Sequence, residues 1–107
     1  MYMAAAMTAE TYQTMADVRA AIDTLDDELV RLLGLRLAAI RRASELKEGV
    51  AQARVPWRVE EVAARIRERA ADVGFDPDTA ERIWRAMVEE CIAFEERALA
   101  GRGGLRS

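Results

Sequence analysis

The sequence predicts an all-α fold: a three-helix chain with a very long first helix, paired as an intertwined homodimer into a six-helix bundle. Apolar residues recur at steps of three and four, which is the stripe of amphipathic helices, and no alternating strand pattern occurs. The only two prolines fall where helices are expected to begin. The length of 107 residues suits one domain. We expect this domain at 11–100, with a flexible leader at 1–10 and a flexible tail at 101–107.

The first helix is expected from about Thr11 to near Gly49, because no proline interrupts the apolar stripe there. At 1.5 Å per residue it would be roughly 58 Å long. A compact chain of this size has a radius of gyration of only about 13 Å. Two shorter helices of one monomer cannot cover such a stripe, so the sequence predicts that a second copy of the chain covers the rest. The stripe consists of Val18, Ile22, Leu25, Leu29, Leu32, Ala39, Ala43, Leu46 and Val50.

Two further helices follow, each with a recognisable start. Pro56 suits the first turn of the second helix, and Gly74 is typical of the position just past a helix end. The third helix is predicted to begin with Asp76 as its N-cap and Pro77 as its first residue, and to end at the glycine-rich residues 101–104. The apolar residues of these helices include Val59, Val62, Ile66, Ala70 and Val73, and then Ile83, Trp84, Met87, Val88, Cys91, Ile92, Ala98 and Leu99.

Composition excludes many kinds of chemistry. The chain has no histidine, which removes Ser-His-Asp triads and His-ligated metals, and the single Cys91 can form neither an internal disulfide nor a zinc cluster. We therefore expect no metal and no cofactor, and a reducing, cytoplasmic location. A net charge of −3 argues against nucleic-acid binding, and no signal peptide or membrane-length apolar run is found. Any catalysis must use Arg, Lys and carboxylates.

Three basic residues occupy informative places on the first helix. Arg36 continues the apolar stripe four residues after Leu32, and Lys47 follows eleven residues later, so both point the same way about 16–17 Å apart. Arg19 lies seventeen residues before Arg36, which puts it about 100° around the helix and roughly 25 Å away. In a dimer, Arg19 could instead serve the pocket of the other chain. The alternative is that these side chains pack their stems and hold their charges in water.

One carboxyl group has a similar position on the third helix. Glu95 lies four residues after Cys91 on the same apolar face, where the protonated acid is favoured unless a cation pairs with it. A buried ion pair is the alternative for Glu95, and a small core residue is the expected role of Cys91. Glu89, Glu90 and Glu96 fall elsewhere and are expected to be solvated. Cations and one carboxylic acid inside a bundle favour a small, multiply anionic ligand.

Arg58 stands at the start of the second helix, where the helix dipole disfavours a cation. A surface ion pair with Glu60 or Glu61 would account for it without any functional role.

The segment Val18–Leu29, the later Leu33–Arg36, the spacing to Lys47 and the segment Phe75–Asp78 together resemble the all-helical (AroQ-class) chorismate mutases. The resemblance covers about residues 15–99. It implies an intertwined dimer of three-helix chains with two equivalent sites. It also implies the Claisen rearrangement of chorismate to prephenate without a cofactor.

The resemblance also implies roles for individual residues. Arg36 would bind a substrate carboxylate, and Arg19 would do so from the other subunit. Lys47 would donate to the ether oxygen as the C–O bond breaks, and Glu95, when protonated, would face the same oxygen. Arg58 matches a further arginine of the family. The resemblance thus implies Lys47, Glu95 and Arg36 as catalytic residues.

The sequence departs from the mutase pattern at three positions. Val55 and Val59 occupy places where many mutases carry acidic residues near the ring hydroxyl of the substrate, and Cys91 replaces a common serine. These three residues complete the expected substrate-binding set.

The segment Pro56-Trp57-Arg58-Val59 is equally similar to isochorismate-pyruvate lyases, relatives that release pyruvate and leave salicylate. The leading prediction is a chorismate mutase feeding phenylalanine and tyrosine synthesis. The alternatives are such a lyase and a non-catalytic dimeric helical module.

Overall fold

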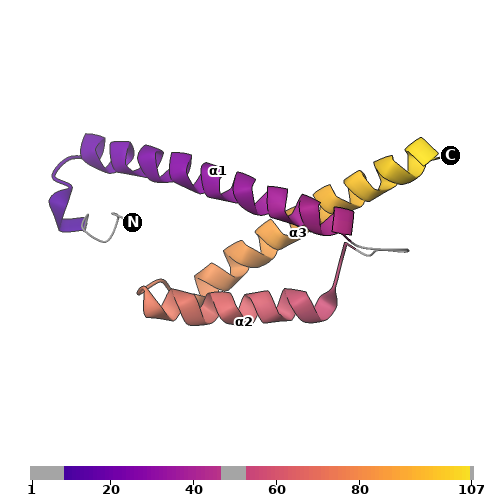
Figure 1. The fold of residues 1–107 in the computed structure, drawn as a ribbon. Coiled ribbons are helices and arrows are strands. Elements are labelled where there is room, and N and C mark those ends of the chain that lie inside the picture. The colour runs from indigo at the N-terminus through magenta and orange to yellow at the C-terminus, as the bar shows by residue number, and fades with distance from the viewer. Residues whose placement is uncertain (1–8, 47–52, 107) are drawn as a thin grey trace. The chain divides into compact units, whose positions relative to one another are not determined.

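The computed structural model describes residues 9–46 and 53–106 of the chain, which form three α-helices (Figure 1). They are α1 (Met15–Leu46), α2 (Pro56–Asp72) and α3 (Pro77–Arg106). A short 3-10 helix, η2 (Ala9–Thr11), precedes α1, and these two ranges contain no strand. The predicted all-α class with a long first helix is confirmed.

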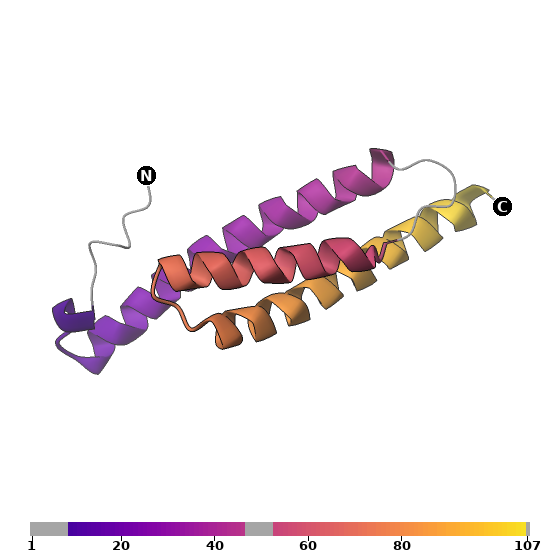
Figure 2. The same cartoon turned by 90° about the horizontal axis from the view of Figure 1, so that it is seen from below.

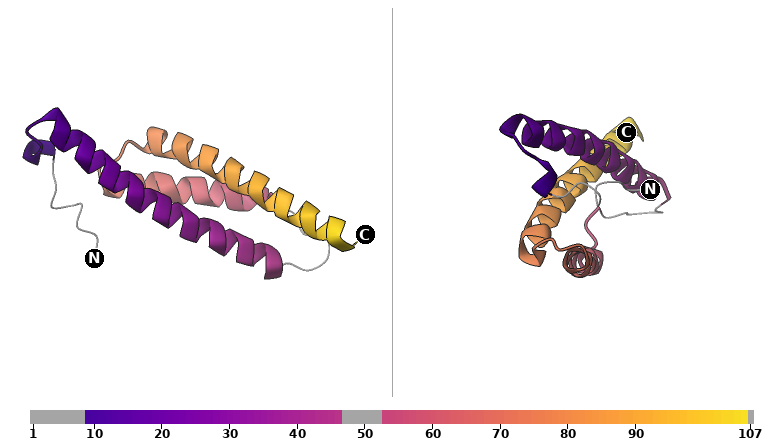
Figure 3. Two further views of the ribbon diagram at one scale, coloured as in Figure 1. Left: turned by 90° about the horizontal axis from the view of Figure 1, so that it is seen from above. Right: turned by 90° about the vertical axis from the view of Figure 1, so that its left-hand side faces the viewer.

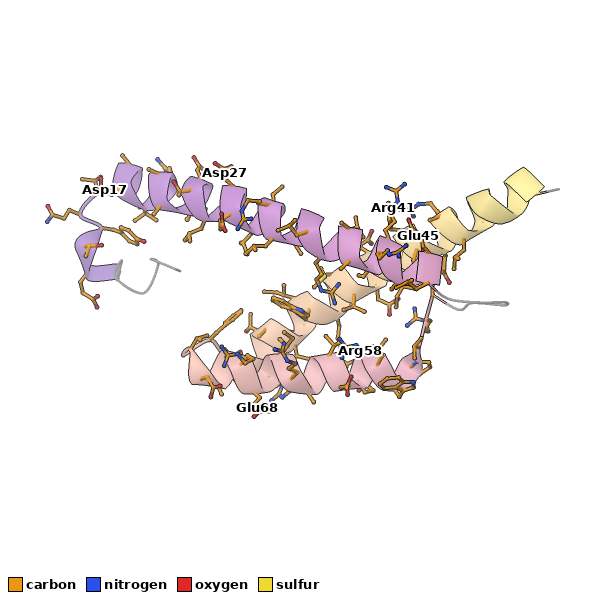
Figure 4. The ribbon with its side chains drawn as sticks, viewed as in Figure 1. Asp17, Asp27, Arg41, Glu45, Arg58 and Glu68 are labelled. Atoms are coloured by element: carbon orange, nitrogen blue, oxygen red, sulfur yellow. The ribbon has the colours of Figure 1, made fainter. Side chains whose placement is uncertain are left out.

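Helix α1 begins at Met15, four residues later than the predicted start. Asp17, labelled in Figure 4, and Thr14 cap it reciprocally. The Asp17 backbone N–H donates to Thr14 Oγ1 at 3.0 Å, and the Thr14 N–H donates to Asp17 Oδ2 at 3.2 Å. This capping box satisfies the amide groups that a helix start leaves open, so it determines where α1 begins. The predicted end near Gly49 and most of the predicted leader, residues 1–8, lie outside the described residues.

The chain divides into two units, Met1–Arg36 and Leu37–Ser107, and α1 runs through the boundary between them. In the described part of the first unit, the apolar stripe of α1 is uncovered. The exposed fractions along it are 50% for Ile22, 39% for Leu25, 52% for Leu29 and 45% for Leu32. Such a row of exposed large aliphatic side chains is unusual for a helix that has no further partner.

The second unit contains α2 and α3, which form a helical hairpin (Figure 2). The α2 end is closed by Gly74, whose φ of 76° is the left-handed conformation that glycine adopts without strain. The Phe75 N–H donates to Ala70 O at 2.8 Å and the Gly74 N–H donates to Ala71 O at 3.3 Å, which is a Schellman motif. Directly afterwards, Asp76 Oδ2 accepts the Thr79 N–H at 2.9 Å and caps α3. The predicted boundaries of this turn are confirmed.

Small side chains allow α2 and α3 to approach closely. Ala63 and Ala70 of α2 are buried, as are Ala80 and Ile92 of α3. The two helices lie side by side in both Figure 2 and Figure 3. Ion pairs also join them at several levels along their length. Between the helices these pairs are Arg85–Glu60, Arg67–Asp78 and Arg67–Glu81, and Arg54, just before α2, pairs with Glu89.

One expectation for the second unit is wrong. The α3 backbone continues through the glycine-rich segment to Arg106. A glycine lowers helix propensity by about 1 kcal/mol but keeps both backbone hydrogen-bonding groups, so it weakens a helix without ending it. Of the apolar residues named for these two helices, Val73 and Ile83 are 70% and 52% exposed in the single chain. Val73 is the C-cap residue of α2, where the helical periodicity has already ended.

No helix in the described ranges combines the length and apolar character needed to cross a membrane.

Candidate active site

Arg19 and Arg36 both lie on α1, in the first unit. Arg36 is half-buried and Arg19 is exposed. Because α1 is continuous between them, its rise separates their backbone positions by about 25 Å. Two arginine side chains that far apart on one chain cannot both bind the same small molecule.

Lys47, the expected donor to the ether oxygen, lies in the range 47–52, outside the described residues. Its role stays a prediction from the sequence.

Glu95 is one of two buried polar residues in the described ranges, with an exposed fraction of 5%. It belongs to the hairpin helix α3, one turn after Cys91, so its burial agrees with the apolar face on which the sequence predicts it. The buried side-chain oxygen and nitrogen atoms of the described residues all have hydrogen-bond partners. Glu95 is therefore held inside the protein by polar contacts, as a buried carboxyl group must be.

The other buried polar residue is Ser44, with an exposed fraction of 3%. Its Oγ donates to the backbone oxygen of Arg41 at 2.8 Å. Ser44 is not among the residues predicted from the sequence. A signal was present, since Ser44 follows Leu37 by seven and Ile40 by four residues and so shares their half-buried side of α1.

The start of α2 carries three of the expected substrate-binding residues. Val55 is the N-cap residue, and its carbonyl oxygen accepts the N–H groups of Arg58 at 3.0 Å and Val59 at 3.1 Å. Both valines are half-buried. The exposed Arg58 guanidinium (Figure 4) donates to Glu61 Oε1 at 2.5 Å, which is one of the two surface ion pairs expected for it.

Cys91 is half-buried on α3, and its Sγ lies 3.8 Å from Met87 Sδ. Contact between two sulfur atoms on one helix face is typical of a packing residue.

Glu89 was expected to be solvated, and this expectation is only half right. Its side chain is about half exposed, but both carboxylate oxygens are bound by Arg54. The two residues are 35 positions apart in the sequence, so no helical spacing could have indicated their contact.

The expected charged site residues are three arginines, one lysine and the buried Glu95, and the structure describes all of them except Lys47. Among the residues that the structure describes, no group of three or more His, Cys, Asp or Glu side chains is placed to hold a metal ion. Arginine side chains bind carboxylates through paired hydrogen bonds, and a protonated carboxyl group or an ammonium group can donate to a developing negative charge. These groups can bind an anion and stabilise a polar transition state.

In its described residues the protein is all-helical. The family model for chorismate mutase type II matches residues 18–96. The chain therefore belongs to the chorismate mutase type II family. It is also 34% identical over 89 residues to isochorismate pyruvate lyase of Pseudomonas aeruginosa, a match that covers 80% of this chain and 85% of that protein. Together these matches support an enzyme, an isomerase or a lyase, rather than a non-catalytic helical module.

Proposed function

We propose that the protein is a chorismate mutase, which rearranges chorismate to prephenate without a cofactor. The observation that carries this proposal is the family match, because residues 18–96 include all five charged candidates, Arg19, Arg36, Lys47, Arg58 and Glu95. The product would feed the synthesis of phenylalanine and tyrosine in the cytoplasm.

The proposed reaction needs positioning and electrostatic stabilisation only. One ether C–O bond breaks while one C–C bond forms within the same molecule, so no group enters or leaves. Negative charge grows on the ether oxygen in the transition state, where Lys47 and protonated Glu95 would donate hydrogen bonds. Arg36 and Arg19 of the partner subunit would hold the two carboxylates and so favour the reactive conformation.

A homodimer is part of this proposal. The exposed stripe of α1 supports it, since large aliphatic side chains in a row gain free energy when a second copy covers them. The separation of Arg19 and Arg36 along α1 supports it as well, because an arginine from each chain could then reach one substrate.

Isochorismate-pyruvate lyase is the second candidate, and two observations favour it. The Pseudomonas aeruginosa relative carries that name. In addition, Val55 and Val59 offer no carboxylate to the ring hydroxyl of a substrate, and both are half-buried at the start of α2. The position of that hydroxyl is what distinguishes chorismate from isochorismate.

A paired assay with the purified protein distinguishes the two reactions. Chorismate is supplied in one tube and isochorismate in the other, and the products are separated by chromatography. We expect efficient formation of prephenate from chorismate. Salicylate and pyruvate from isochorismate, with only slow prephenate formation, would establish the lyase instead. No product from either substrate would contradict both.

The proposed role of Glu95 predicts that an amide can replace its carboxyl group. The Glu95→Gln variant still offers an N–H donor to the ether oxygen, so its kcat/KM should stay close to wild type. Glu95→Ala serves as the control, and it should be slow because no donor remains. Equally large losses in both variants would remove Glu95 from the proposed mechanism.

A further inference from the structure

The start of α2 differs from the starts of the other two described α-helices. Thr14 caps α1 and Asp76 caps α3 through side-chain oxygen atoms. The N-cap residue of α2 is Val55, whose aliphatic side chain makes no capping hydrogen bond. The first turn also holds no acidic residue but does hold Arg58, a cation that the helix dipole disfavours there. Apart from Pro56 at its first position, the start of α2 therefore has few local features to stabilise it.

A contact from outside the helix holds the residue that precedes the N-cap. Arg54 directly precedes Val55, and its guanidinium forks onto the Glu89 carboxylate of α3. Arg54 Nη1 donates to Glu89 Oε2 at 2.8 Å, and Nη2 donates to Oε1 at 2.5 Å. The hydrogen bonds from Arg54 hold the pKa of Glu89 below its usual value, so the pair stays charged at neutral pH. Two parallel bonds fix the orientation of both groups, which a single contact cannot do.

The pair is the last level in a ladder of ion pairs along the hairpin. Passing from the turn toward the start of α2, the partners on α3 advance in the opposite direction, as antiparallel helices require. The successive levels are Arg67–Glu81, Glu60–Arg85 and Arg54–Glu89. The ladder follows the antiparallel register that the packing of α2 against α3 sets, and Arg54–Glu89 lies at its open end.

Expected site residues of both helices lie toward the open end of the hairpin. Cys91 and Glu95 follow Glu89 by two and six residues, which is about 3 Å and 9 Å further along α3. Arg58 and Val59 lie in the first turn of α2, and their N–H groups bind the carbonyl oxygen of Val55, next to Arg54. One fork therefore connects the start of α2 to the part of α3 that leads to the buried carboxyl group.

We propose that Arg54 and Glu89 are positioning residues, which anchor the uncapped start of α2 and thereby place Arg58 and Val59 for the substrate. The fork touches no reacting atom in this role, and it acts through the backbone of Val55. This inference rests on the proposed function for its catalytic consequence, whereas its structural part can be tested without any substrate.

Hydrogen exchange tests the structural part. The Glu89→Gln variant replaces the carboxylate that binds Arg54 with a neutral amide. The backbone amides of Arg58 and Val59 should then exchange several-fold faster, because the uncapped helix start frays. Glu81→Gln is the matched control, because it makes the same change in another carboxylate of α3. Glu81 also pairs with an arginine of α2, but at the turn end of the hairpin. The control variant should leave the exchange of these two amides unchanged. Equal exchange in the two variants would overturn the proposal.

Steady-state kinetics tests the consequence for the site. Misplacement of a substrate-binding turn should lower kcat/KM in Glu89→Gln on the order of tenfold, mainly through KM, with Glu81→Gln close to wild type. The double variant Arg54→Glu/Glu89→Arg restores a pair of opposite charges and should recover part of the loss. Faster exchange with unchanged kinetics would overturn the positioning role. A wild-type chain that turns over neither chorismate nor isochorismate would instead contradict the proposed function, and the exchange result would still decide whether the fork anchors α2.

Discussion

Replacing Lys47 with alanine is expected to lower kcat/KM on the order of 10²–10³-fold while the protein stays folded and assembled. The physical reason is that the ammonium group would meet the ether oxygen only as negative charge develops there, so its loss raises the barrier more than it weakens substrate binding. The decrease should therefore fall largely on kcat. Steady-state kinetics on chorismate measure it, and circular dichroism with sedimentation verifies the fold and the assembly.

Arg41→Ala is the matched control for this variant. Arg41 is an exposed cation on α1 (Figure 4), and it precedes Lys47 by six residues in the sequence, so its removal changes the net charge by the same amount. A specific donor predicts nearly unchanged kinetics in Arg41→Ala. Similar losses in both variants would indicate only a general attraction of anions, and a wild-type rate in Lys47→Ala would exclude its assigned role.

Helix boundaries could be predicted wherever a single residue determines the local backbone conformation. Pro56 and the Asp76-Pro77 pair indicated two helix starts, and Gly74 indicated the left-handed residue after α2, because each has a conformational preference of its own. The start of α1 was missed because it depends on a reciprocal contact between Thr14 and Asp17 rather than on one residue. The end of α3 was missed because glycine only weakens a helix.

The same distinction applies to the candidate site. The burial of Glu95 follows from helical periodicity, and the Arg58–Glu61 pair follows from a spacing of three, so both could be expected from the sequence. The fork between Arg54 and Glu89 could not, because it depends on the register between two helices, which is set by packing along the whole hairpin.

The proposal that Arg19 comes from the other chain of the dimer can be tested directly, because two inactive variants should complement each other. Arg19→Ala and Arg36→Ala should each lose on the order of 10²-fold in kcat/KM, since each leaves a substrate carboxylate without its cation. In a dimer that contains one chain of each kind, one site would lack both arginines. The other site would combine an intact Arg36 with the intact Arg19 of the other chain.

Such hybrid dimers can be prepared by co-expressing the two variants with different affinity tags and purifying on both tags in turn. The hybrid should recover about half of the wild-type activity per dimer, because two-fold symmetry leaves one of its two sites complete. A dimer with Arg19→Ala in both chains, prepared in the same way, should stay inactive and excludes contamination by wild-type enzyme. If Arg19 served the site of its own chain, each site of the hybrid would lack one arginine and no activity would return. A chain that sediments as an active monomer would likewise contradict the shared site, since nothing on a single continuous α1 could bring Arg19 and Arg36 to one substrate.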